Sequence, residues 1–159
     1  MEEQTKVCIY ARVSTSQQDF THQLTSLRAY AKEHHYQVVK EYTEKISGAK
    51  KVAEREALKE LLEDVEQNQV KKILVFECSR LSRRALDFLS IIEKLNEKGV
   101  SVFILQNGLE TLLPDGKVNP IASLVLGIMS QFNSMERDLI RARMKNGYDN
   151  LRAQHPGEK

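Results

Sequence analysis

Arg12 and Ser14 lie two residues apart in the segment YARVS (10–14), where an apolar stretch of the chain gives way to polar residues. In an extended chain, side chains at this spacing point to the same side, so both can face one ligand. A guanidinium group binds phosphate oxygens through two parallel hydrogen bonds, and a serine hydroxyl supplies a nucleophile. The pair therefore indicates chemistry at a phosphate group.

A second arginine cluster lies in SRLSRR (79–84), which follows the apolar segment KKILVFE (71–77). We expect a helix to begin there, with Arg80 and Arg83 as neighbours on one face and free N–H groups that favour an anion. One well-placed arginine accelerates phosphoryl transfer by about 10³ to 10⁵. Arg12, Arg80 and Arg83 around Ser14 therefore predict phosphoryl transfer that needs no metal.

The same residue types also occur in small-molecule phosphate-binding α/β modules that do no chemistry, so both classes stay open at this point. The histidines have no partner for nucleophilic catalysis, and the base that deprotonates Ser14 is not assigned. Cys8 and Cys78 have no metal-ligand spacing and are expected to be reduced core residues. We predict neither a metal nor another cofactor.

Strands and helices that alternate along the chain must position these residues. Apolar patterns predict strands at 7–10, 36–42, 71–77 and 100–105, and helices at 20–33, 54–66 and 83–98. The alternation predicts an α/β domain with a mainly parallel sheet flanked by helices. Ligands of such sheets bind beyond the carboxyl ends of the strands, which is where both arginine-bearing segments begin.

A long helix is predicted after the turn at 114–116, with Asn119 as its N-cap, Pro120 in its first turn and its end beyond Arg143. Its apolar side chains form one long stripe, which we expect to bind another subunit in part; packing within the domain is the alternative. The stripe contains Ile121, Leu124, Val125, Ile128, Met129, Phe132, Met135 and Leu139. Basic residues follow at Arg137, Arg141, Arg143, Lys145 and Arg152, for which a solvated helix face is the simplest interpretation.

The composition fits one globular domain. The chain has 159 residues, of which 41% are hydrophobic and 29% charged, with a net charge of +2. No apolar run is long enough for a membrane span and MEEQ is no secretory signal, so we expect a cytoplasmic protein.

Four segments occur in the order found in serine site-specific recombinases of the resolvase and invertase type: YARVSTSQQD, the Ser47-Gly48 loop, SRLSR and MERDLIRAR. The chain resembles the N-terminal catalytic domain of this family over nearly its whole length. The resemblance implies a resolvase-like fold with a long C-terminal helix. It also implies an enzyme of bacteria or mobile elements that cuts and rejoins double-stranded DNA through a 5′-phosphoserine, as a homodimer that becomes a homotetramer.

The resemblance also assigns site residues. Ser14 resembles the nucleophile, and the arginines of the site correspond to Arg12, Arg55, Arg80 and Arg83. Residues expected to position the site are Tyr10, Gln18, Gln23 and Ser79. Many small resolvases have an aspartate where this chain has Ser79, so Glu77 takes over that carboxylate, or the carboxylate is dispensed with, or Ser79 caps a helix. Glu44 stands where an aspartate is common.

On the long helix, the resemblance implies that Glu136 and Arg137 lie where the family forms its subunit interface and contacts DNA. We expect the interface and DNA contacts to include Ile128 and Phe132 of the apolar stripe and the basic residues Arg141 and Arg143. We expect residues 1–118 to form the α/β part, 119–150 the interface helix and 151–159 a tail that leads to an absent DNA-binding domain. Phosphate contacts alone would give weak, salt-sensitive and poorly specific binding. The remaining alternative is an inactive DNA-binding or assembly domain.

Overall fold

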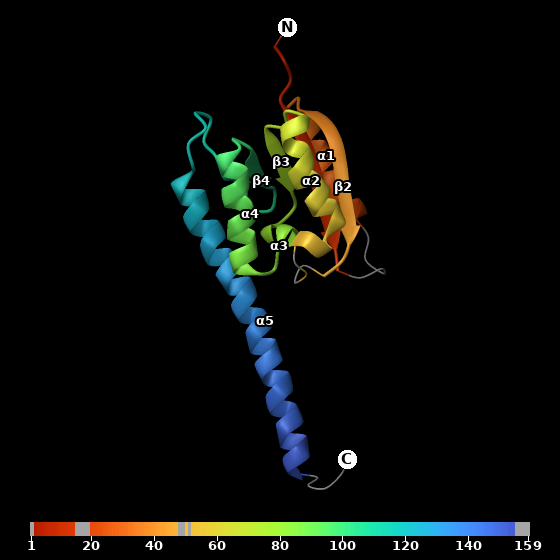
Figure 1. The fold of residues 1–159 in the computed structure, drawn as a ribbon, viewed down its shortest axis with the longest axis vertical. Helices are drawn as coiled ribbons and strands as arrows, with labels where there is room; N and C mark the ends of the chain where they lie inside the picture. The colour runs from red at the N-terminus through yellow and green to blue at the C-terminus, as the bar shows by residue number, and fades with distance from the viewer. Residues whose placement is uncertain (1, 15–19, 48–49, 51, 155–159) are drawn as a thin grey trace.

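The computed structural model describes residues 2–14, 20–47, 50 and 52–154, and its centre is a five-stranded sheet of order β2-β1-β3-β4-β5 (Figure 1). The strands are β1 (Lys6–Val13), β2 (Gln37–Lys45), β3 (Lys72–Val75), β4 (Ser101–Ile104) and β5 (Leu109–Glu110). The first four are parallel to one another and β5 pairs antiparallel with β4. The predicted mainly parallel α/β fold is confirmed, and β5 is an addition to it.

Helices cover both faces of the sheet. On one face, α2 (Glu56–Gln67) and α4 (Ala85–Glu97) pack on a core that includes Tyr10, Ile73 and Val102. On the other face, α1 (Thr21–Glu33) packs through Leu27 and Ala31 on the opposite side of the same strands. This alternation of side chains along β1 and β3 is why both strands read as continuous apolar runs.

The carboxyl ends of the parallel strands lie at the edge opposite the N-terminus, and the one-turn helix α3 (Cys78–Leu81) lies at this edge (Figure 1). The single helix predicted at 83–98 is wrong at its start. Ser82 has an extended backbone and its hydroxyl accepts a hydrogen bond from the Arg84 amide (3.1 Å), so α3 ends and α4 begins only at Ala85. Arg80 and Arg83 are therefore not neighbours on one helix face, contrary to the prediction.

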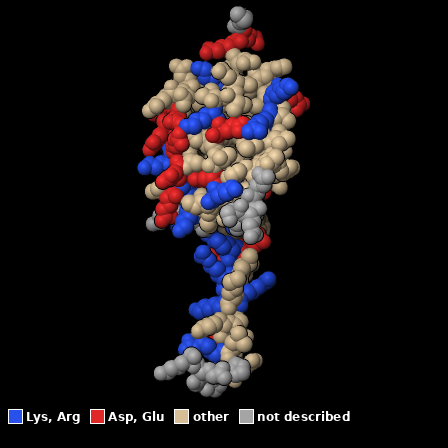
Figure 2. Space-filling view, turned by 90° about the vertical axis from the view of Figure 1, so that its right-hand side faces the viewer, with Lys and Arg blue, Asp and Glu red and all other residues tan. Residues whose placement is uncertain are grey.

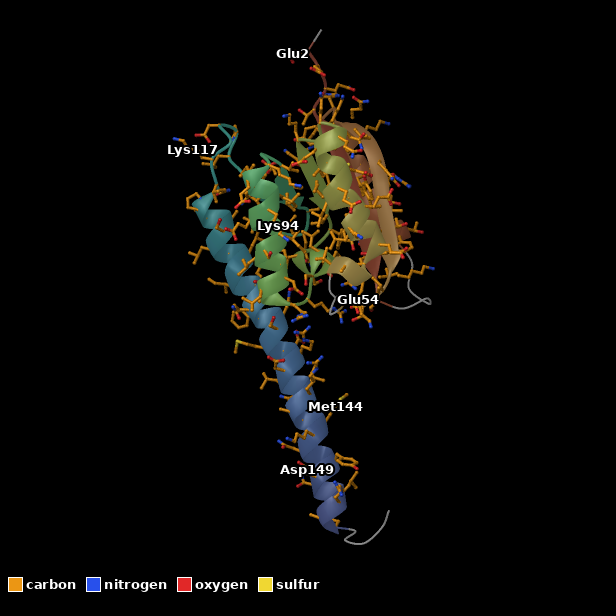
Figure 3. The ribbon with its side chains drawn as sticks, in the orientation of Figure 1. Glu2, Glu54, Lys94, Lys117, Met144 and Asp149 are labelled. Carbon is orange, nitrogen blue, oxygen red and sulfur yellow. The ribbon has the colours of Figure 1, made fainter. Side chains whose placement is uncertain are left out.

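The helix α5 (Pro120–Gln154) begins as predicted, because the Asn119 side chain accepts hydrogen bonds from the amides of Ile121 (3.2 Å) and Ala122 (3.3 Å). Its first turns pack on the domain, and its second half extends beyond the α/β part, where Met144 and Asp149 lie (Figures 1 and 3). The helix continues to Gln154, so residues 151–154 are not the tail that was predicted. Among the described residues, none of the helices has an apolar stretch that could span a membrane.

Candidate active site

Arg12 lies in β1 and is completely buried, with its guanidinium group turned onto main-chain oxygens. Its Nε donates to the carbonyl of Arg80 (3.1 Å), Nη2 to that of Ser79 (2.8 Å) and Nη1 to that of Ile46 (2.9 Å). Because α3 is only one turn long, the carbonyls of Ser79 and Arg80 lack helical partners, whereas Ile46 lies just after β2. Burial, and then the nearby charge of Arg55, lower the pKa of Arg12 to about 10, so the group stays cationic at neutral pH.

Arg55, at the start of α2, supports the same turn from the other side and is also completely buried. Its Nη2 donates to the Arg80 carbonyl (2.8 Å) and to the Tyr10 hydroxyl, and its Nη1 donates to the Leu81 carbonyl. Its Nε pairs with Glu44 at 3.2 Å. Two buried cations therefore hold the carbonyl end of α3.

Tyr10 and Glu44 complete this buried network. The Tyr10 hydroxyl donates to one Glu44 oxygen, and the other accepts the amide of Ala57 at 3.2 Å. Burial raises the pKa of Tyr10, so the phenol remains a neutral donor. The sequence showed Glu44 only as a residue at a position where an aspartate is common, and in the structure it is the carboxylate that pairs with Arg55.

Ser14 follows β1 directly and is half-buried. The main chain just before it is held by the buried Gln23 of α1, whose Nε2 donates to the Arg12 carbonyl (3.0 Å) and whose Oε1 accepts the Arg12 amide (3.4 Å). Gln23 therefore holds the main chain at the end of β1, and its role in positioning the site stays a prediction. Gln18 and Gly48 lie outside the residues that the structure describes.

Arg80 connects the end of β1 to α3. Its Nη1 donates to the Arg12 carbonyl (3.0 Å) and its Nη2 pairs with Glu77 (2.9 Å). The Ser79 hydroxyl donates to the same Glu77 oxygen at 2.9 Å, so it does not cap the helix, and the capping alternative is wrong. Among the residues described, Arg80 Nε is buried without a hydrogen-bond partner.

A groove of about 570 Å³ lies between the α3 turn and α5. It is lined by Glu77, Ser79, Arg83, Asn133, Glu136, Arg137, Ile140 and Arg141. Arg83 is exposed there, and Arg137 has Nε and Nη1 buried with no hydrogen-bond partner in the described part of the chain. Arg83 and Arg137 therefore offer donors at this groove, while the guanidinium groups of Arg12 and Arg55 are directed at main-chain carbonyls.

The remaining predicted residues lie on α5. Glu136, Arg137 and Arg141 reach the groove, whereas Arg143 lies on the exposed second half of the helix. Figure 2 shows lysine and arginine side chains gathered along this projecting half. Ile128 and Phe132 are 48% and 65% exposed and, with Leu89 of α4, line a shallow apolar depression.

Two other groups of the site, the Ile46 carbonyl and the Asn133 side chain, were not predicted from the sequence. The carbonyl of Ile46 binds Arg12, and a main-chain oxygen leaves no signature in the residue types. Asn133 lines the groove and its amide lies 3.6 Å from the Cys78 sulfur. Its position three residues before Glu136 placed it on the same helix face, which is a signal that could have found it. Cys8 and Cys78 are buried and free, as predicted.

Residues 7–155 match the family model described as "Resolvase, N terminal domain". A resolvase of Clostridium perfringens is 34% identical over 144 residues, which are 91% of this chain and 70% of the relative. The Tn1546 transposon resolvase of Enterococcus faecium is 30% identical over 88% of this chain and 66% of its own length.

Solved structures give the same result. The N-terminal catalytic domain of TP901-1 integrase superposes with a TM-score of 0.67 at 32% identity, over 85% of this chain and 98% of that one. A resolvase family site-specific recombinase from Streptococcus pneumoniae gives 0.62 at 27% identity, over 93% and 98%. The chain belongs to the resolvase family, and it is a serine recombinase catalytic domain.

Proposed function

We propose that this domain cuts and rejoins double-stranded DNA with Ser14 as the nucleophile. The Ser14 oxygen attacks a backbone phosphorus, the bond from phosphorus to the 3′ oxygen breaks, and a free 3′ hydroxyl leaves with a proton. The phosphate stays on Ser14 as a 5′-phosphoserine ester. Attack on that ester by the 3′ hydroxyl of another strand restores the phosphodiester and releases the serine hydroxyl, so no outside energy source is needed.

One observation carries the proposal: a groove lined by Arg83, Arg137 and Arg141 adjoins the α3 turn, to which Arg80 ties the end of β1 just before Ser14. The transition state of phosphoryl transfer carries negative charge on the phosphate oxygens, and fixed cations stabilise it. The cationic side chains of Arg83, Arg137 and Arg141 that line the groove are suited to these oxygens. Arg12 and Arg55 contribute mainly by holding the turn that presents Arg80.

We further propose that the exposed apolar side chains of α5 form the contact in a homodimer that becomes a tetramer during exchange, in the cytoplasm of a bacterial host. The support is their number along one helix, since a soluble domain rarely leaves so long an apolar row uncovered. They are Ile121, Leu124, Ile128, Phe132, Met135 and Leu139, each at least 48% exposed.

The test is covalent trapping on DNA. Wild-type protein at its full natural length should form an adduct with duplex DNA that survives SDS, and Ser14→Ala should form none. Addition of EDTA should leave the yield unchanged, because arginines supply the positive charge. An adduct that persists in Ser14→Ala would contradict the assignment of the nucleophile, and loss in EDTA would contradict the metal-free mechanism.

A further inference from the structure

We propose that Glu77 is a positioning residue of this active site, whose carboxylate fixes the Arg80 guanidinium against the end of β1. The inference rests on the strand-exchange chemistry proposed above. It concerns the one carboxylate that contacts both Ser79 and Arg80 in the described part of the molecule.

The geometry fixes the plane of the guanidinium. Arg80 Nη2 lies 2.9 Å from Glu77 Oε1, and Arg80 Nη1 donates to the carbonyl of Arg12 at 3.0 Å. Because the group is planar and rigid, two anchors on two nitrogens also fix the direction of the third. That third nitrogen is Nε, which is buried and unpartnered among the described residues. Glu77 therefore holds the guanidinium group against the Arg12 carbonyl and fixes the direction of its remaining nitrogen.

Charge gives Glu77 a second effect. Arg55, Arg83 and Arg80 are all close enough to Arg12 that their charges lower its pKa. These positive charges repel one another, and without a nearby anion the Arg80 guanidinium group would turn toward solvent. The side chains of Arg80 and Glu77 are only 21% and 26% exposed, so water screens the pair incompletely. Glu77 offsets the repulsion where Arg80 meets Arg12.

Ser79 orients this carboxylate and does not replace it. Its hydroxyl donates to Glu77 Oε1 at 2.9 Å, the same oxygen that binds Arg80. An aspartate at position 79 would place a carboxylate on the same turn, next to Arg80 in the chain. The two arrangements should therefore be exchangeable, with the carboxylate supplied from position 77 or from position 79.

The experiment measures the rate of SDS-resistant adduct formation by the full-length protein on a labelled pool of duplexes with randomised sequence. Glu77→Ala should slow the rate by about 10- to 100-fold, the size of effect that a misplaced catalytic group causes. The double variant Glu77→Ala with Ser79→Asp should recover most of this loss. Glu63→Ala, at an exposed position of α2, is the matched control and should react like wild type.

A second readout does not depend on DNA cleavage. In wild type, the NMR signal of the Arg80 Nε–H group, assigned with Arg80→Lys, should exchange slowly with water. In Glu77→Gln, which keeps the size of the side chain, it should exchange fast. If wild type forms no adduct, the proposed function fails, whereas the NMR comparison still decides the role of Glu77.

Two results would overturn the inference. One is a Glu77→Ala protein that reacts at the wild-type rate with an unchanged Arg80 signal. The other is a loss of rate that Ser79→Asp does not recover although the double variant melts at the wild-type temperature, because Glu77 would then serve only the local fold. If Glu77→Ala does not fold, the reaction rates of Glu77→Gln, with and without Ser79→Asp, are compared in its place.

Discussion

Arg12 and Arg80 each donate a hydrogen bond from the guanidinium group to the main-chain carbonyl of the other residue, at 3.1 and 3.0 Å. The two residues are 68 positions apart in the chain, so this exchange joins the end of β1 to the turn after β3. The segment that carries Ser14 and the segment that carries Arg80 are thereby fixed to one another. Any change that weakens this exchange should affect folding and catalysis together.

Arg12→Lys should show how much the exchange contributes. A lysine ammonium group cannot reproduce three hydrogen bonds in fixed directions, and buried carbonyls left unpaired are costly. We expect the free energy of unfolding to fall by about 3 kcal/mol in urea titrations, with adduct formation lost. Arg28→Lys, at an exposed site on α1, is the control and should shift the midpoint much less. Equal midpoints for both variants would contradict the structural role of Arg12.

Gln23→Ala should loosen the chain just before Ser14. The substitution removes two hydrogen bonds to the Arg12 main chain and leaves the buried Arg12 amide unpaired, while the Arg12 carbonyl keeps its hydrogen bond from Arg80 Nη1. The expected loss of stability is about 1 to 3 kcal/mol. Gln67→Ala at the exposed end of α2 provides the comparison. If Gln23→Ala melts like Gln67→Ala and forms adduct at the wild-type rate, Gln23 does not position the site.

Most of the fold followed from periodicity, whereas the hydrogen bonding of the site did not. The strand ends that carry Arg12 and Arg80 were placed at one edge because parallel strands share their carboxyl ends. Arg12 and Arg55 donate to main-chain carbonyls because α3 ends after one turn. Ser82 ends α3 through a local hydrogen bond with the Arg84 amide. A serine in SRLSRR fits a helix or its interruption equally well, so the interruption could not be predicted.

The contacts of Glu77 likewise could be predicted from the sequence only in part. Its spacing from Arg80 is that of a helical ion pair, and the sequence supplied this signal. The sequence left open whether Glu77 replaces the aspartate common at position 79 or whether that carboxylate is dispensed with. Deciding between them depends on where the Ser79 hydroxyl points. Side-chain direction in so short a turn is set by tertiary contacts, which the residue order does not contain.

Phe132→Ala should separate assembly from folding. The side chain is 65% exposed, so its removal should change the free energy of unfolding by less than about 0.5 kcal/mol. If α5 is the contact between subunits, the same change should weaken self-association in sedimentation experiments. An unchanged sedimentation profile at equal concentration would remove α5, at least around Phe132, from the interface.

Arg141→Gln should report on contact with the DNA backbone. If Arg141 neutralises one phosphate in the groove, the plot of log binding constant against log salt concentration should lose about one unit of slope. The reduction should be the same for unrelated DNA sequences, since phosphate contacts carry no base information. Glu93→Gln on α4 serves as a control, because it lies away from the groove. An unchanged slope for Arg141→Gln would contradict this contact.

The location of the DNA phosphate on the chain tests the central claim most directly. Trypsin should release residues 13–28 as one peptide, which contains Ser14 and Ser16 among its hydroxyl residues. After the adduct formed on DNA is digested with nuclease and trypsin, mass spectrometry should find the nucleotide phosphate on Ser14. A nucleotide phosphate on Ser16, or on any residue outside this peptide, would contradict the proposed mechanism.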